Sequence, residues 1–233
     1  MPQPKWSPIV ARAAHPGIFE RPSPLSSRTV YVVDDDRNVR MMISYTLTDA
    51  ELNSHPFASG ADFLAALPDL KPGCILLDVR MPDMDGLEVM AELSRRGIDW
   101  PVVFMTGHGE VGVAVEAMKL GAIDFLQKPF AEDALLACFA RGFDLLDSRS
   151  EAAERRRRAR ERASQLTARE TEVLQGLLAG LSNKLLAERL GISLRTVEMH
   201  RGNMMDRLGV DNLAEALTLA MEAGLAPLQA QPG

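Results

Sequence analysis

The chain has 233 residues, of which 46 % are hydrophobic and 25 % are charged, and its net charge is −6. This composition is ordinary for a folded globular protein, and no apolar run reaches the roughly 18 residues of a membrane span, so we expect no membrane partner. The two cysteines, Cys74 and Cys138, form no CxxC pair and lie in apolar stretches, so we expect buried free thiols rather than a disulfide.

The charge is unevenly spread along the chain. Residues 1–147 carry 13 Lys/Arg and 21 Asp/Glu, whereas residues 148–233 carry 13 and 11. This asymmetry favours an acidic domain followed by a domain that faces nucleic acid. Residues 148–164 alone hold seven Arg and three Glu, so a DNA-binding domain beyond them would depend on a local basic face and not on its bulk charge.

The first segment, residues 1–27, contains six prolines and shows no sustained apolar period. This pattern predicts a disordered extension. The segment lacks the charged start and long apolar core of a secretory signal, and we expect a cytoplasmic protein.

Residues 28–147 alternate between short apolar runs and amphipathic stretches. We expect strands over residues 30–33, 52–57, 74–77, 102–105 and 123–126, and helices near residues 39–47, 61–67, 86–96, 110–120 and 131–146. Such alternation predicts a doubly wound α/β domain with a five-stranded parallel sheet.

Polar residues follow four of these predicted strands. Asp34 and Asp35 come after the first, Asp78 after the third, Thr106 after the fourth, and Lys128 shortly after the fifth. Ligands in open α/β sheets bind beyond the carboxyl ends of the strands, where these side chains would meet. The set suits phosphoryl transfer to a carboxylate, with Asp78 as the nucleophile. Carboxylates are typical Mg²⁺ ligands, while a hydroxyl and an ammonium suit phosphoryl oxygens.

Each of these residues also has a simpler interpretation. Asp78 or Thr106 could cap a helix, and a lysine is most often a solvated surface charge. The complete set, with the Met81-Pro82-Asp83 turn and the Lys128-Pro129-Phe130 sequence, resembles the receiver domain of two-component response regulators over about 120 residues.

That resemblance implies further properties. It implies Asp78 as phosphoacceptor, a Mg²⁺ site formed by Asp34, Asp35, Asp78 and the backbone carbonyl of Arg80, and a cis peptide bond at Lys128-Pro129. It also implies a switch in which Thr106 moves toward the phosphoryl group and Phe125 rotates inward. Members of this kind dimerise through the surface that matches residues 111–119 and 123–125. The alternative is that the apolar residues there, such as Val115 and Met118, are ordinary core-facing or lightly exposed residues.

An enzyme is the main alternative for this half of the chain. Phosphatases of the haloacid dehalogenase type use a similar set but place a second Asp two residues after the nucleophile as general acid. Arg80 occupies that position here. We therefore expect a Mg²⁺-dependent phosphoacceptor and not a turnover enzyme.

Residues 148–164 have many helix-forming residues but no apolar face. Glu151 and Arg155, Glu154 and Arg158, and Arg157 and Glu161 are spaced i,i+4, which favours a solvated linker helix. The arginines could contact DNA phosphates, but a solvated connector is the favoured interpretation.

Residues 165–227 have a helical period. Thr167 and Glu170 form a capping box before the first helix. Helices over residues 183–190 and 194–208 are separated by Gly191-Ile192-Ser193, which is typical of a helix-turn-helix, and a fourth helix is predicted near residues 213–223. The alternative is a helical module that binds only proteins.

Residues 180–187 and 192–201 resemble the LuxR-type DNA-binding domain, and the chain from residue 28 resembles the NarL/FixJ family, most closely its FixJ members. The predicted DNA contacts are Asn183, Lys184, Arg195, Thr196, Glu198, Met199, His200, Arg201 and Arg207. Glu198 and Met199 would read bases, although Glu198 could instead pair with Arg195 or Arg201.

The resemblance implies a response regulator whose Asp78 accepts a phosphoryl group from a sensor histidine kinase. Phosphorylation would switch dimerisation and sequence-specific binding to double-stranded DNA, with RNA polymerase as a further partner. The predicted divisions are a disordered extension (1–27), the receiver (28–147), the linker (148–164), the helix-turn-helix domain (165–227) and a flexible tail (228–233).

Overall fold

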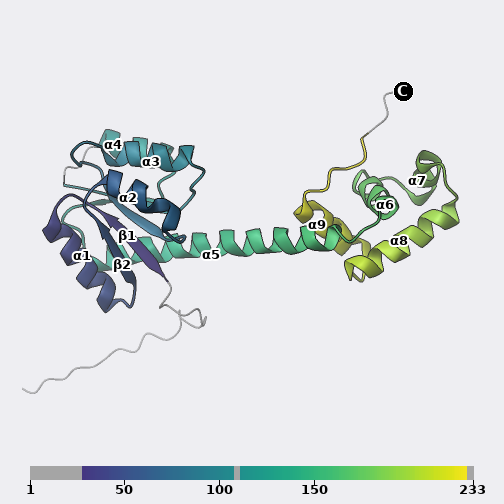
Figure 1. Cartoon of the computed structure of the whole chain (residues 1–233), viewed down its shortest axis with the longest axis horizontal. Helices are drawn as coiled ribbons and strands as arrows, with labels where there is room; N and C mark the ends of the chain where they lie inside the picture. Colours follow the sequence, from purple (N-terminus) through teal and green to yellow (C-terminus); the bar gives the residue numbers. More distant parts are fainter. Residues whose placement is uncertain (1–27, 108–110, 230–233) are drawn as a thin grey trace, which may run out of the picture.

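The computed structural model describes residues 28–107 and 111–229. The predicted extension over residues 1–27, residues 108–110 and the end of the predicted tail, residues 230–233, lie outside the described residues. Within the described residues, five strands form one parallel sheet, and a helical region follows it (Figure 1). The predicted fold class is confirmed.

The sheet is built from the short apolar runs of the first half of the chain. In spatial order its strands are β2 (Asn53–Phe57), β1 (Thr29–Val33), β3 (Cys74–Asp78), β4 (Val102–Thr106) and β5 (Asp124–Gln127). All neighbouring strands are parallel. Because the winding direction reverses between β1 and β3, the crevice beyond their carboxyl ends is the expected ligand site.

Helices cover both faces of the sheet because the central strands are apolar on both sides. Helix α1 (Arg37–Asp49) and the first part of α5 (Glu132–Ala163) pack on one face, where Ile43 and Phe139 are buried. On the other face lie α2 (Gly60–Ala66), α3 (Gly86–Arg95) and α4 (Val111–Lys119), with Phe63 and Val89 buried. A short 3-10 turn, η2 (Leu67–Asp69), follows α2.

Helix α5 is a single helix of 32 residues that continues through the predicted linker and connects the two halves of the chain (Figure 1). Ion pairs support its exposed middle. The three pairs that the i,i+4 spacing predicts are present: Arg155 with Glu151 at 3.8 Å, Arg158 with Glu154 at 2.7 Å, and Arg157 with Glu161. Hydrogen bonds from Arg157 and Arg158 lower the pKa of Glu154 to about 2.

The last turns of α5 differ from the predicted solvated linker. Ala159 is only 3 % exposed and belongs to the buried cluster of the C-terminal helices. These helices are α6 (Ala168–Leu178), α7 (Asn183–Leu190), α8 (Leu194–Leu208) and α9 (Leu213–Ala223). The small side chain of Ala159 lets α5 approach α9 closely, so the end of α5 is part of the C-terminal core.

Two local predictions are confirmed by the structure. Cys74 and Cys138 are buried free thiols, as predicted, and burial raises the pKa of Cys74 to about 12. The Lys128-Pro129 peptide bond is cis. Among the residues that the structure describes, no helix is both long and apolar enough to cross a membrane.

Candidate functional site

Three carboxylates meet at the point where the sheet reverses direction. Asp34 follows β1, Asp35 is its neighbour, and Asp78 is the last residue of β3. One carboxylate oxygen from each of the three lies within 4.8 Å of the others. Asp34 is fully buried and Asp78 is 8 % exposed, whereas Asp35 faces solvent. The predicted acidic residues are therefore brought together beside open solvent.

Lys128 is the cationic partner of this cluster. Its Nζ donates hydrogen bonds to Oδ2 of Asp34 at 2.6 Å and to Oδ2 of Asp78 at 2.9 Å. Burial alone would lower the pKa of Lys128, but hydrogen bonds to the two carboxylates outweigh it and raise the pKa. For Asp34, burial raises the pKa even though the Lys128 hydrogen bond opposes the shift.

The cluster fits a small divalent cation. Three carboxylates and one ammonium leave two negative charges, and hard oxygen donors of this kind are what Mg²⁺ prefers. Asp34, Asp35 and Asp78 would supply the ligands. The backbone N–H of Arg80 donates to Oδ1 of Asp78 at 3.4 Å, and the Arg80 carbonyl is predicted to join the ligands.

Thr106, the end of β4, lies next to this cluster in the sheet. Its neighbour Met105 is in register with Asp78, and the Thr106 side chain is 3 % exposed. The Thr106 carbonyl accepts a hydrogen bond from the backbone N–H of Lys128 at 2.7 Å. Phe125 on β5 is half-buried against the core. The two predicted switch residues, Thr106 and Phe125, therefore lie on β4 and β5, the two strands that follow β3 in the sheet.

Gly86 was not identified by sequence reasoning, although the site depends on it. A Cβ at Gly86 would lie 2.3 Å from the carbonyl oxygen of Asp78 and 2.9 Å from the ring of Phe104. The Gly86 N–H donates to the carbonyl of Val79 at 2.9 Å, which closes the loop after β3. The start of α3 can lie this close to Asp78 because residue 86 has no side chain.

Asp36, the third acid after β1, has a structural role. Its side chain accepts a hydrogen bond from the N–H of Asn38 and caps α1. Arg40, which sequence reasoning did not identify, donates to the carbonyl of Asp34 at 2.6 Å. The cap at Asp36 and the contact from Arg40 hold the backbone between β1 and α1 in place, and this segment carries the Asp34 side chain.

The second candidate surface is the helix-turn-helix formed by α7 and α8. Ser182 caps α7, Gly191 ends it with φ +64°, and Ser193 caps α8. Positive φ is unstrained for glycine, which lets the chain turn sharply between the helices. This arrangement leaves the N-terminal turns of α8 at the surface.

The predicted DNA contacts lie at the start of α7 and along the first half of α8, with one exception. Arg201 donates to Oδ1 of Asn183 at 3.4 Å, which links the two helices. Among the described residues Glu198 forms no ion pair, so the predicted alternative of pairing with Arg195 or Arg201 is not seen here. The exposed members are Lys184, Arg195, Glu198 and Met199, and the half-buried members are Asn183, Thr196, His200 and Arg201.

Arg207 is the exception, because it lies in the last turn of α8. Its Nε donates to Oε1 of Glu170 at 3.1 Å, and Glu170 also accepts from the N–H of Thr167. Burial alone would raise the pKa of Glu170, but these contacts outweigh it and lower the pKa. The sequence identified the Thr167–Glu170 capping box but not the pairing of Glu170 with Arg207, which lies 37 residues away.

Both regions of the chain match known protein families. Residues 30–140 match the family described as "Response regulator receiver domain", and residues 164–220 match "Bacterial regulatory proteins, luxR family". The transcriptional regulatory protein FixJ of Bradyrhizobium diazoefficiens is 41 % identical over 196 residues, which are 84 % of this chain and 96 % of that protein.

Two solved structures cover most of the chain. The response regulator StyR has a TM-score of 0.71 at 40 % identity, with 84 % of this chain and 98 % of that chain covered. Full-length FixJ from B. japonicum has a TM-score of 0.54 at 40 % identity, with 85 % and 98 % covered.

Proposed function

The chain belongs to the FixJ-like response regulators, transcriptional regulators with a receiver and a LuxR-type DNA-binding domain, and we propose that Asp78 is its phosphoacceptor. The observation that carries this assignment is the position of Asp78 at the centre of the site. Its carboxylate is bound to Lys128 and grouped with Asp34 and Asp35 at the sheet's reversal point. A sensor histidine kinase is the proposed donor.

In the proposed transfer, a carboxylate oxygen of Asp78 attacks the phosphorus of a kinase phosphohistidine. The P–N bond breaks, an O–P bond forms, and the leaving imidazole nitrogen keeps the electron pair and takes up a proton. Lys128 would move from pairing with Asp78 Oδ2 to neutralising a phosphoryl oxygen, and the Thr106 hydroxyl would donate to another. When bound by the three carboxylates and the Arg80 carbonyl, Mg²⁺ supplies the charge that lets two anionic groups approach.

The residues at the site favour a phosphoacceptor over a phosphatase. An enzyme that hydrolyses external phosphoesters needs a general acid to protonate the leaving group. Two residues after Asp78 is Arg80, whose side chain cannot act as an acid at neutral pH. We therefore propose that the phosphoryl group on Asp78 is a signal, with Thr106 and Phe125 as the switch.

The proposed output is DNA binding through α8. In helix-turn-helix proteins the N-terminal residues of the second helix contact base edges while flanking groups hold phosphates. Glu198 and Met199 are exposed in this part of α8 and are proposed to read bases. The proposed phosphate contacts are Asn183, Lys184, Arg195, Thr196, His200, Arg201 and Arg207.

We propose dimerisation through α4 and β5 on phosphorylation. Val115 and Met118 on α4 are 48 % and 50 % exposed, which places apolar surface beside β5. A dimer would let two α8 helices read a two-fold symmetric site in double-stranded DNA. Sedimentation of phosphorylated and unphosphorylated protein tests the dimerisation, because equal masses for the two forms would exclude it.

A transcriptional regulator of this kind would work in the cytoplasm and contact RNA polymerase.

Labelling with acetyl phosphate and Mg²⁺ tests the phosphoacceptor. We expect a mass increase of one phosphoryl group in the wild type and none in Asp78→Asn, because the amide is not a nucleophile. Asp83→Asn is the matched control, since Asp83 is an exposed carboxylate in the loop after β3. Undiminished labelling of Asp78→Asn, or loss of labelling in Asp83→Asn alone, would assign the phosphoryl group to another residue.

A further inference from the structure

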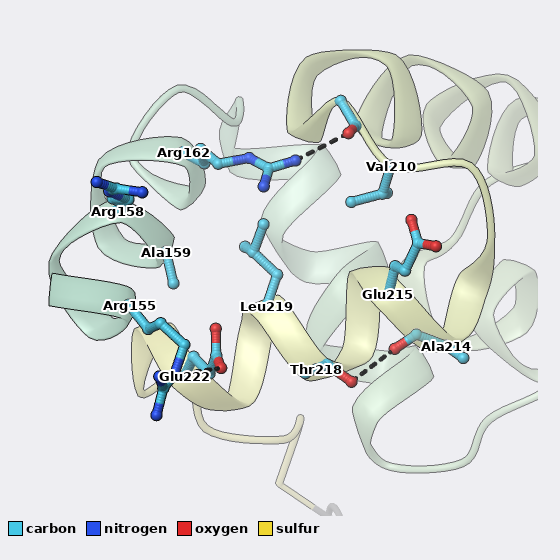
Figure 2. Close-up of a pocket in the computed structure, with 11 residues that line it drawn as sticks. Arg155, Arg158, Ala159, Arg162, Val210, Ala214, Glu215, Thr218, Leu219 and Glu222 are labelled. Atoms are coloured by element: carbon cyan, nitrogen blue, oxygen red, sulfur yellow. Dashed lines mark hydrogen bonds and ion pairs between the residues drawn. The ribbon is translucent and has the colours of Figure 1, made fainter. Parts of the chain in front are cut away.

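The end of α5 lies against the C-terminal end of α8. Figure 2 shows the cleft between α5 and α9, where Arg155, Arg158 and Arg162 extend from α5. Arg162 crosses the cleft toward the turn that follows α8, whereas Arg155 lies 4.0 Å from Glu222 on α9. Of the three arginines, only Arg162 contacts the end of the helix that is proposed to enter the DNA groove.

Arg162 binds backbone carbonyls at this helix end. Its Nη2 donates to the carbonyl of Leu208 and, at 2.9 Å, to the carbonyl of Gly209. Gly209 ends α8 in the left-handed conformation, with φ +59°. The last carbonyls of a helix lack intrahelical partners and carry partial negative charge, so a guanidinium there stabilises the end of the helix.

Contacts at other positions fix the helix that carries Arg162. Ala159, one turn earlier on α5, is 3 % exposed within the core that also contains Leu208 and Leu219. Near its middle, α5 is held by the receiver through Arg28 with Asp147 at 3.0 Å and Arg149 with Asp99 at 3.5 Å. A continuous helix therefore connects the receiver to the end of α8.

We propose that Arg162 is a positioning residue for DNA recognition, an inference that rests on α8 being the DNA-reading helix. By holding the carbonyls of Leu208 and Gly209, Arg162 fixes the C-terminal end of α8 relative to α5. The angle at which the N-terminal residues of α8 meet base edges then depends on α5. Specific binding needs this angle, whereas non-specific binding to phosphates depends mainly on charge.

The test compares three variants of the full chain: Arg162→Ala, Arg162→Lys and Arg160→Ala. Arg160 is exposed on the same helix, so its replacement removes the same charge without touching α8. All proteins are first phosphorylated with acetyl phosphate and Mg²⁺. The probe is a duplex recovered from random DNA by selection with the phosphorylated wild-type protein, and a scrambled duplex of equal length measures non-specific binding. The readout is the ratio of specific to non-specific affinity, corrected for the DNA-active fraction of each preparation.

We expect Arg162→Ala to lower this ratio by about five- to tenfold, a change equal in size to the loss of one hydrogen bond to a charged group, and Arg160→Ala to leave it unchanged. Arg162→Lys should restore much of the ratio, because an ammonium can also donate to the two carbonyls. Equal ratios for Arg162→Ala and Arg160→Ala would overturn the inference. An Arg162→Ala preparation with a lower DNA-active fraction but the wild-type ratio would also overturn it, because Arg162 would then support only folding. Wild-type protein without sequence preference would instead refute the proposed DNA-binding function.

Discussion

Nζ of Lys128 lies 2.9 Å from Oδ2 of Asp78, the carboxylate that is proposed to accept the phosphoryl group. Lys128 therefore partly neutralises the negative charge of the site. The same ammonium also binds Asp34, so it competes electrostatically with any cation that needs both carboxylates. The affinity of the site for a cation should therefore rise when Lys128 is removed.

Lys128→Ala is expected to strengthen Mg²⁺ binding. Removing one positive charge from within 3 Å of two carboxylates increases the attraction for a divalent cation, by at least about tenfold in affinity for partly buried charges. Calorimetric titration with Mg²⁺ measures this change. Lys71→Ala is the control, because Lys71 is an exposed lysine on the loop before β3. Weaker binding in Lys128→Ala would contradict a shared site.

Gly86→Ala is expected to destabilise the receiver. The new methyl group would lie 2.3 Å from the Asp78 carbonyl oxygen, so the start of α3 must move, at a cost of about 1–3 kcal/mol. Denaturant unfolding measures this cost. In Gly112→Ala the new methyl group would contact nothing within 4 Å, and alanine favours helices, so this control should be neutral or slightly stabilising. Equal stabilities for the two variants would refute the close approach of Gly86 to the Asp78 carbonyl.

Glu170→Gln is expected to destabilise the C-terminal helices by about 1.5–3 kcal/mol at neutral pH, because charged hydrogen bonds to Thr167 and Arg207 are lost. The folded-state pKa of Glu170 lies below its ordinary value of 4.5, so its charged form stabilises the fold above that pH. This contribution is lost as the pH falls through the folded-state pKa. The stability difference between wild type and variant should therefore shrink below pH 4.5, and a difference that grows there would contradict the pairing.

Glu198→Ala is expected to relax base preference at one position of each half-site. Glutamate can accept a hydrogen bond from cytosine N4, and such a contact contributes about 1–3 kcal/mol to discrimination. Because Glu198 is exposed and forms no ion pair in the described part of the chain, it is available for this contact. Binding-site selection with both proteins measures the preference. An unchanged motif with an even shift in affinity would exclude base reading.

The grouping of the polar residues at one sheet edge could be predicted from the sequence, because parallel strands deliver their last residues to one edge. Asp34, Asp78 and Thr106 each follow an apolar run, and that local pattern is sufficient to bring them together. The bounds of α8 could likewise be predicted from the sequence. Ser193 and Gly209 cap its two ends, and both residue types favour these positions for local reasons.

Contacts between distant segments could not be predicted in this way. The pairing of Arg207 with Glu170 and the close approach of Gly86 to Asp78 depend on tertiary packing and leave no periodic pattern. Ala159 is a single small residue among arginines, so its burial is not apparent from an apolar face. The continuous α5 helix was only partly predicted, because exposed ion pairs favour a helix without indicating what its end packs against.

The most direct test of the account is the DNA affinity of wild type and Asp78→Asn, each with and without acetyl phosphate and Mg²⁺. The duplex is one recovered by selection with the phosphorylated wild type. If the charge change at Asp78 biases the receiver toward a DNA-binding dimer, phosphorylation should raise wild-type affinity at least about tenfold, which corresponds to about 1.4 kcal/mol. Asp78→Asn should show no rise. An equal rise in both proteins, or no rise in a wild type shown by mass to be phosphorylated, would contradict the account.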